Sequence, residues 1–147
     1  KAVIDILDPI SKDEDKDLRL DAFESLKSCA SAGEKATKAV IDIHCRLIKD
    51  GYGQVRLDAS ESLKSCVSTG GEEAAKAVID ILGPWTKNEH PRVRKLACLT
   101  LGSCAEAAGK EAAKALIDIL GPLTKDQDLN VRLQVCESLA SCASTAG

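Results

Sequence analysis

The chain has 147 residues, enough for one domain of ordinary size with a sizeable buried core. Apolar residues make up 44% of it and aromatic residues only 2%, which excludes wholesale disorder and predicts a core of small aliphatic side chains. The formal charge of −3 argues against a generally basic, nucleic-acid-binding surface, and the absence of an apolar run of about 18 residues argues against a membrane span.

The sequence repeats itself at a nearly fixed interval. The motif KAVIDI starts at residues 1, 38 and 76, and KALIDI starts at residue 114. These starts divide the chain into four units: 1–37, 38–75, 76–113 and 114–147. A fixed period of this size predicts stacked supersecondary units, that is, a solenoid. Neither end carries an atypical capping unit, so we expect a single repeat array that is an excerpt of a longer one.

The first helical pattern of each unit is clearest over residues 34–49, where apolar side chains recur at helical spacing. In three units a proline near the end of this pattern is expected to kink or stop the helix. These prolines are Pro9, Pro84 and Pro122. Unit 2 carries Arg46 instead.

The second helical pattern begins near the sixteenth residue of each unit, after a turn that holds Asp or Asn. In unit 2 its inward stripe is Val55, Ala59, Leu63 and Cys66. Glycines follow this pattern in the first three units and predict left-handed helix ends. They are Gly33, Gly70-Gly71 and Gly109.

Paired helices of this period, with proline in the first and Asp-x-x-x-x-Val-Arg entering the second, resemble HEAT repeats. The stretches Asp50…Val55-Arg56 and Asp126…Val131-Arg132 carry the pattern best, while unit 3 has Asn88 in place of Asp. The resemblance implies an all-α, right-handed α-α superhelix of four HEAT-like two-helix repeats. It also implies that the arginine meets the turn aspartate of an adjacent unit. The residues expected in these inter-repeat contacts are Arg19, Arg56, Arg94, Arg132, Asp13, Asp50 and Asp126.

The seven cysteines are odd in number and include no Cys-x-x-Cys motif. Four share one inward repeat position: Cys29, Cys66, Cys104 and Cys142. Neighbouring helices lie roughly 8–10 Å apart, farther than the Cα separation of about 4.4–6.8 Å that a disulfide needs. We therefore interpret the cysteines as small buried thiols in a reducing compartment, the cytoplasm.

His44 stands where other units have Leu, so we expect it at the edge of the core, and His90 before Pro91 is expected to cap a helix. No phosphate-binding glycine loop, nucleophile elbow or paired metal ligand occurs. We therefore predict no enzyme activity, no metal and no cofactor.

Helical projection directs a second set of side chains on the second helices away from their partner helices. The resemblance places these helices on the concave side. The candidate partner-binding residues are Leu20, Glu24, Lys27, Leu57, Glu61, Lys64, Lys95, Leu99, Leu133 and Glu137. The leucines predict a shallow apolar ridge for a partner helix or extended segment. Alternatively, each leucine packs against the next repeat.

The leading functional hypothesis is a non-catalytic protein–protein interaction scaffold, with no membrane or nucleic-acid partner and with end-to-end self-association of the uncapped array. One alternative is a microtubule- or filament-associated HEAT module that uses turn residues such as Trp85, Lys87 and Arg92. For Trp85 a place in or at the edge of the core is the other interpretation. A second alternative, a HEAT-like tetrapyrrole lyase or chaperone, rests on the fold alone.

Overall fold

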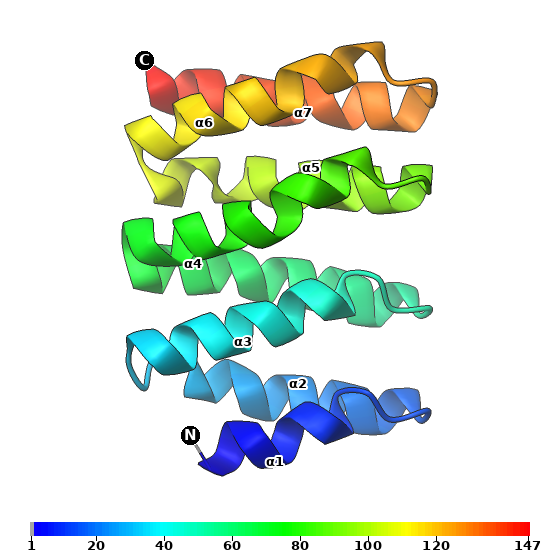
Figure 1. Cartoon of the computed structure of the whole chain (residues 1–147), viewed down its shortest axis with the longest axis vertical. Helices are drawn as coiled ribbons and strands as arrows, with labels where there is room; N and C mark the ends of the chain where they lie inside the picture. Colours follow the sequence, from blue (N-terminus) through cyan, green and yellow to red (C-terminus); the bar gives the residue numbers. More distant parts are fainter. Residues whose placement is uncertain (1) are drawn as a thin grey trace.

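A computed structural model describes residues 2–147, in which helices stack as successive antiparallel pairs (Figure 1). The α-helices are α1 (Ala2–Ile10), α2 (Lys16–Cys29), α3 (Glu34–Leu47), α4 (Gly53–Leu82), α5 (Pro91–Ala108), α6 (Lys110–Leu120) and α7 (Leu129–Ala146). Two short 3-10 helices are η1 (Gly83–Lys87) and η2 (Gly121–Lys125). No strand occurs between residues 2 and 147, so the prediction of an all-α repeat solenoid is confirmed.

The helix α4 contains two helices of the repeat because its chain turns at Gly71. This glycine has φ 59° and ψ −144°, a conformation that a residue with a Cβ atom rarely adopts. Residues 53–70 therefore form the second helix of one pair and residues 72–82 the first helix of the next. Gly33 and Gly109 also have positive φ values, of 118° and 84°. The predicted left-handed turns are thus confirmed at one residue after each of the first three second helices.

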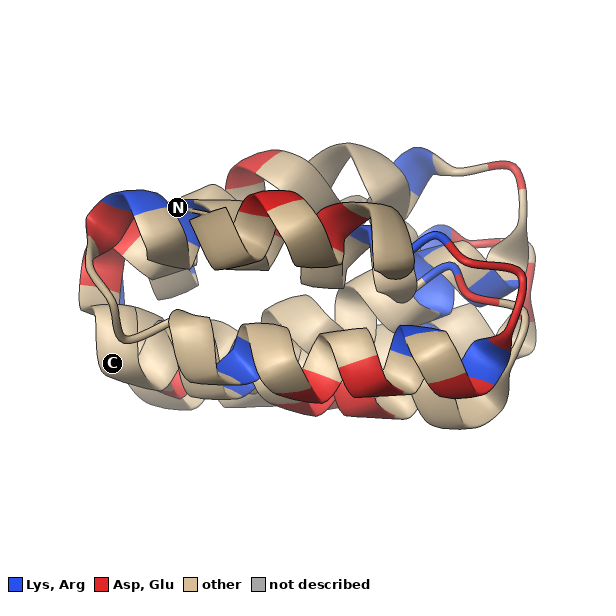
Figure 2. Ribbon diagram, turned by 90° about the horizontal axis from the view of Figure 1, so that it is seen from below, with Lys and Arg blue, Asp and Glu red and all other residues tan. Residues whose placement is uncertain are grey.

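The helices form two layers, seen from the N-terminal end of the stack in Figure 2. One layer holds the first helices, namely α1, α3, residues 72–82 and α6. The other holds the second helices, namely α2, residues 53–70, α5 and α7. The core lies between the layers and consists mainly of aliphatic side chains, as the composition predicts. Leu26, Leu63 and Leu101 on the second helices are fully buried, and Leu139 is half-buried at the last pair.

The prolines end the first helices in two of the three units that carry them. The α-helices stop at Leu82 and Leu120, and the chain continues as η1 and η2, with Pro84 and Pro122 in their first turns. Proline is tolerated there because the first N–H groups of a helix have no intrahelical acceptor. Pro9 instead lies within the last turn of α1.

Three sequence-based expectations about cysteine and histidine are wrong. His44 is fully buried, not at the core edge, with its ring centroid 4.7 Å from that of Phe23. His90 occupies the N-cap position of α5, but its side chain makes no capping hydrogen bond. Cys136 is exposed, because no helix pair within the described residues covers the outer side of α7. Cys29 is half-buried, the other five cysteines are buried, and all seven are free thiols.

Candidate functional site: the second-helix face and the seams between units

The predicted ridge is only partly exposed. Leu57 and Leu133 are 55% and 57% exposed, respectively, and Lys95 at the same repeat position between them is also exposed. Leu20 is only half-exposed and packs against the core cluster, so the expected line of three exposed leucines is reduced to two. Leu99 is half-buried as well. The ridge is therefore two apolar points on α4 and α7, separated by a basic side chain on α5.

Acidic and basic side chains border these leucines on the same helices. The exposed acids are Glu24, Glu61 and Glu137, and the exposed lysines are Lys27 and Lys64. None of these five makes an ion pair within residues 2–147. Their charges are accordingly free to meet a charged partner.

The arginines lie at another place, along the edge where first helices turn into second helices and charged residues gather (Figure 2). We call the contact between successive helix pairs a seam: the first seam joins α2 to residues 53–70, the second joins those residues to α5, and the third joins α5 to α7. Inward-facing arginines follow this edge from seam to seam.

The first and third seams each contain a two-bond ion pair. At the first, Arg19 donates from Nε and Nη2 to the Asp50 carboxylate at 2.6 and 3.0 Å. At the third, Arg94 donates to Asp126 at 2.8 and 2.9 Å. In both, the arginine Nη1 also donates to two carbonyl oxygens of its own turn. Each guanidinium thus binds its own turn and the next one, a geometry that suits the planar fork of arginine.

These ion pairs are nearly excluded from solvent, which changes the pKa of the carboxyl groups. The hydrogen bond from Arg94 holds the pKa of Asp126 below its ordinary value, against the opposing effect of burial. Burial raises the pKa of Asp50, but the hydrogen bonds from Arg19 and the Tyr52 N–H outweigh it, so the pKa again lies below its usual value. Both carboxylates are therefore ionised at neutral pH.

The second seam lacks this ion pair. Arg56 donates from Nη1 to the carbonyl oxygens of Asp50 and Gly51, its own turn, just as Arg19 and Arg94 do. Asn88 stands where the other seams have Asp50 and Asp126, and its Oδ1 accepts the His90 N–H. Within the described residues, no acceptor meets the Arg56 Nε or Nη2 group. The neutral amide of Asn88 cannot supply the charge that holds the guanidinium elsewhere.

Hydroxyl groups form hydrogen bonds across two of the seams, at residues that the sequence analysis did not predict to be in contact. Ser60 and Thr100 lie 2.9 Å apart across the second seam, and Ser138 donates to the Cys98 carbonyl oxygen at 2.8 Å across the third. At the third seam Gly102 makes room for Ser138, whose Cβ atom lies 2.5 Å from where a Cβ on Gly102 would be. The recurrence of Ser or Thr at residues 25, 62, 100 and 138 is the sequence signal that could have identified these contacts.

Two further polar side chains lie at the first seam: Arg46 bonds across it, and His44 packs against Phe23 of α2. Arg46, the residue that replaces proline in unit 2, donates to Asp8 of the preceding unit at 2.5 Å. His44 Nδ1 lies 3.1 Å from the Ser62 hydroxyl, while its Nε2 is buried without a partner. Burial lowers the pKa of His44 to about 4, so the ring is neutral at physiological pH.

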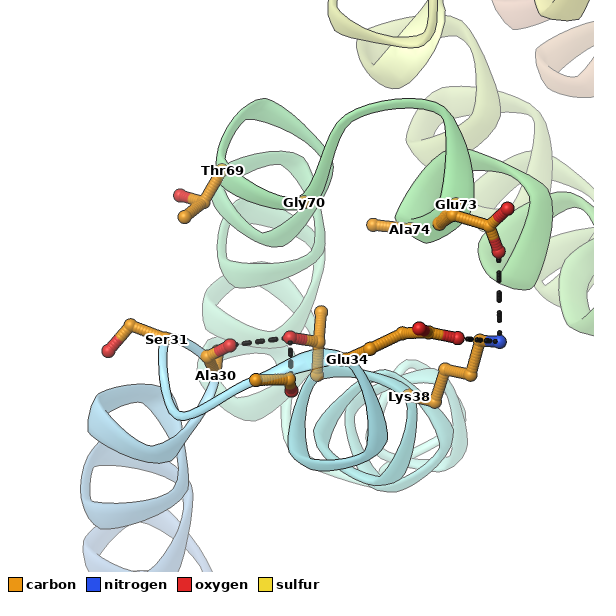
Figure 3. A pocket seen from close by; sticks show the side chains of 10 residues that line it. Ala30, Ser31, Glu34, Lys38, Thr69, Gly70, Glu73 and Ala74 are labelled. Carbon is orange, nitrogen blue, oxygen red and sulfur yellow. Dashed lines mark hydrogen bonds and ion pairs between the residues drawn. The ribbon is translucent and has the colours of Figure 1, made fainter.

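The opposite edge of the stack holds a hollow of about 310 Å³ beside the glycine turns (Figure 3). Lys38 lies at its rim, 2.8 Å from Glu34 and 3.7 Å from Glu73. Thr37 donates to the Ala30 carbonyl oxygen. The polar groups of this hollow therefore bind one another, and the remaining lining consists of small side chains.

Trp85 is half-buried and packs against the core, with the Lys49 ammonium 3.7 Å above its ring centroid. Lys87 and Arg92 nearby are exposed. One face of the indole is thus already occupied. Within residues 2–147, no helix is long and apolar enough to cross a membrane. The same residues contain no group of three or more potential metal ligands.

Comparison with known proteins identifies the fold. No family model and no curated protein matches the chain. Two engineered proteins with crystal structures each superpose on this chain with a TM-score of 0.56. They are 23% and 25% identical to it, and the alignments cover 97% and 96% of it. A designed armadillo repeat protein, 15% identical with a TM-score of 0.53, covers 92%. The chain spans 63%, 38% and 63% of these three structures. By its fold, therefore, the chain is an α-helical repeat solenoid.

Proposed function

We propose that the chain is a non-catalytic binding scaffold, of HEAT-like repeat type, that holds an amphipathic helix of a partner protein against its second-helix face. The observation that carries this proposal is the pair of exposed leucines, Leu57 and Leu133, at one repeat position two units apart. A solvated helix face has no need of large apolar side chains at a repeated position, whereas a partner helix buries them.

The distance between the two exposed leucines determines how far apart the apolar residues of a partner helix should be. Helices pack at about 8–10 Å, so the two leucines lie roughly 16–20 Å apart along the stack. A helix rises 1.5 Å per residue, so its apolar residues should be about 11–13 positions apart. Lys95 lies between the leucines and favours an acidic residue near the middle of the partner helix, while Glu61 and Glu137 favour basic residues at its flanks.

The candidates that use other surfaces receive less support. A filament-binding surface built on Trp85 would need its ring free, but the Lys49 ammonium covers one face of it. A tetrapyrrole site would need a deep apolar pocket, whereas the hollow beside the glycine turns has an ion pair at its rim and the larger hollows are lined by charged residues such as Arg19, Asp50 and Arg56.

A displayed library of amphipathic helical peptides tests the proposal. We expect the chain to enrich peptides with two apolar anchors about 11–13 residues apart, and Leu57→Asp or Leu133→Asp to weaken their binding at least about tenfold, the effect of losing one buried apolar anchor. Lys114→Ala, on the first-helix layer, is the matched control and should bind like the original chain. If the Leu57→Asp and Leu133→Asp variants retain the selected peptides with unchanged affinity, the surface assignment is wrong.

A further inference from the structure

The second seam contains an arginine that is held like its equivalents but binds no carboxylate. Arg56 donates from Nη1 to two carbonyl oxygens of its own turn at 2.7 and 3.0 Å. The same bonds hold Arg19, at 2.7 and 2.9 Å, and Arg94, at 2.8 and 2.9 Å. Because the guanidinium group is planar, these bonds direct the Nε and Nη2 groups of all three arginines toward the next turn. Arg56 is therefore oriented for a two-bond carboxylate contact that no described residue supplies.

The amide of Asn88 explains why this contact is missing. Asp50 and Asp126 each accept an N–H of their own turn with Oδ1 and use both carboxylate oxygens for arginine. Asn88 keeps the turn bond, since its Oδ1 accepts the His90 N–H at 3.0 Å. Its other terminal group is an NH2, which donates and cannot accept from Arg56. Asparagine at this position thus preserves the turn and removes the ligand of the arginine.

A hollow of about 490 Å³ adjoins Arg56 at the turn edge of the stack, between the turn of unit 2 and the first turn of α5. Its lining also includes three exposed basic side chains, which are Lys49, His90 and Arg92. The Lys49 ammonium lies 3.7 Å from the ring centroid of Trp85, a contact that also crosses the second seam. The hollow is therefore surrounded by two arginines, a lysine and a histidine.

Two acidic residues lie close to this hollow without neutralising it. Asp50 is part of the lining, but its carboxylate binds Arg19 across the first seam. Glu89 is 86% exposed, and its carboxylate lies 3.6 Å from Nε2 of His90. Among residues 2–147, neither carboxylate forms an ion pair with an arginine or lysine of the hollow. The hollow therefore has a surplus of positive charge.

Apolar side chains form the remaining wall of the hollow. Ile48 is buried, Val93 and Leu96 are half-buried, and Pro91 is exposed. A free inorganic anion gains nothing from such a wall, whereas a peptide can place an apolar side chain on it. Charge complementarity and the apolar wall together define one occupant, an acidic peptide segment with apolar residues beside its acids.

We propose that the second seam binds an acidic segment of a partner protein, with an Asp or Glu carboxylate of that segment on Arg56 as Asp50 is on Arg19. Lys49 and Arg92 attract further acidic residues, and an apolar side chain of the segment packs on the wall of the hollow. The site belongs to the edge where charged residues gather (Figure 2). It uses none of the exposed leucines of the second-helix face, so it does not depend on the function proposed for that face.

Fluorescence anisotropy with a labelled peptide of alternating aspartate and leucine tests the proposal. We expect saturable binding that weakens as sodium chloride is added, because salt screens the charges at the rim. The same peptide with asparagine in place of aspartate should bind at least about tenfold more weakly, because the charge-assisted bonds are lost. If inorganic phosphate displaces the peptide as well, mole for mole, as the unlabelled peptide does, the hollow is a simple anion site and the proposal is wrong.

Asn88→Asp should close the site from within the chain. It supplies an intramolecular carboxylate to Arg56 and leaves the bonds of Arg56 to its own turn in place, so we expect peptide affinity to fall by about tenfold or more. Asn130→Asp, in the first turn of α7, adds the same charge at an exposed residue of another turn and should leave the affinity unchanged. Equal losses in the two variants would mean that net charge, not the Arg56 contact, governs binding.

Substitutions of Arg56 test the anchor directly. Arg56→Gln should lose about tenfold or more in affinity, and Arg56→Lys should also bind less tightly although its charge is unchanged, because an ammonium group cannot make two parallel bonds. Lys35→Gln, an exposed residue in the first turn of α3, removes one positive charge at the opposite edge and is the matched control. Circular dichroism checks the fold of each variant. A folded Arg56→Gln variant with the affinity of the original chain would overturn the proposal.

Discussion

The first and second seams join equivalent helices and differ in chemistry. In both, an arginine of the second helix binds two carbonyl oxygens of its own turn. At the first seam Arg19 also grips Asp50, and Arg46 adds a bond to Asp8. At the second seam Asn88 occupies the position that Asp50 has at the first, and the one ion pair between the two helix pairs within the described residues is the exposed contact of Lys38 with Glu73 at 3.7 Å.

The difference shows that the fold does not require the ion pair. Apolar packing aligns the helices at the second seam, where the Ser60–Thr100 hydrogen bond provides the local polar contact. Stacked repeats contribute to stability approximately as a sum of unit and interface terms, so unequal interfaces imply unequal local stability. We expect the second seam to be less sensitive to charge and pH than the first.

The largest loss of stability should come from removing the ion pair of the first seam, so that it lacks a carboxylate as the second seam does. Asp50→Asn leaves Arg19, whose side chain is only 11% exposed, without its charged acceptor. Removing one partner of a buried ion pair costs about 3–5 kcal/mol, and we expect a loss of that size in the free energy of unfolding, measured with urea at pH 7. Asp126→Asn at the third seam is the matched variant. A loss below about 1 kcal/mol would mean that solvent screens the pair more than its burial indicates.

His44 should make the first seam sensitive to acid. Its pKa falls from 6.5 to about 4 on burial, so the unfolded chain binds the proton more readily than the folded one. The stability of the neutral ring is fully present above pH 6.5 and is lost as the pH falls from 6.5 to about 4, by about 3 kcal/mol. His44→Leu, which restores the leucine of the other units, should remove this part of the pH dependence in melting experiments.

The stability of the His44→Leu variant at lower pH is the control for this prediction. Asp50 and Asp126 have lowered pKa values, so their contribution is present above their ordinary value of 3.8 and disappears below it. His44→Leu should therefore still unfold below pH 4. If its stability between pH 6.5 and 4 falls as steeply as that of the original chain, His44 is not the group responsible.

The converse change at the second seam should have a smaller effect. Asn88→Asp supplies the carboxylate that Arg56 lacks, and we expect a gain of about 1 kcal/mol, because desolvation of the new charge offsets much of the attraction. The measurement is urea unfolding beside Asn88→Ala, which removes the acceptor for the His90 N–H and should destabilise. A loss with Asn88→Asp would indicate that Arg56 cannot reach the next turn.

The smallest effect should follow from Lys38→Ala. Its ammonium binds Glu34 and approaches Glu73, but all three side chains are about half exposed or more. Exposed pairs contribute about 0–1 kcal/mol, so the change in the free energy of unfolding should stay below that limit. A larger loss would reveal that the second seam relies on this contact after all.

Much of the fold could be predicted from the repeat pattern. The left-handed turns at Gly33, Gly71 and Gly109 follow from the glycines, because few other residues adopt a positive φ. The site was harder to predict. Leu20 and Leu57 share a repeat position, yet one packs against the core and the other is exposed. The repeat position of a residue predicts the direction in which its side chain leaves the helix axis. It does not predict whether a neighbouring helix or solvent lies in that direction.

The sequence alone determines local matters: where helices begin and end, which face of each is apolar, and which turns need glycine or a short acid. These follow from periodicity and backbone preference, which act within a few residues. The tertiary structure decides which residues at equivalent repeat positions differ in burial and in ion pairing. His44 is buried against Phe23, Arg56 lacks a carboxylate, and Cys136 is exposed, because burial and charge pairing depend on the neighbouring unit, which is distant from these residues in the sequence.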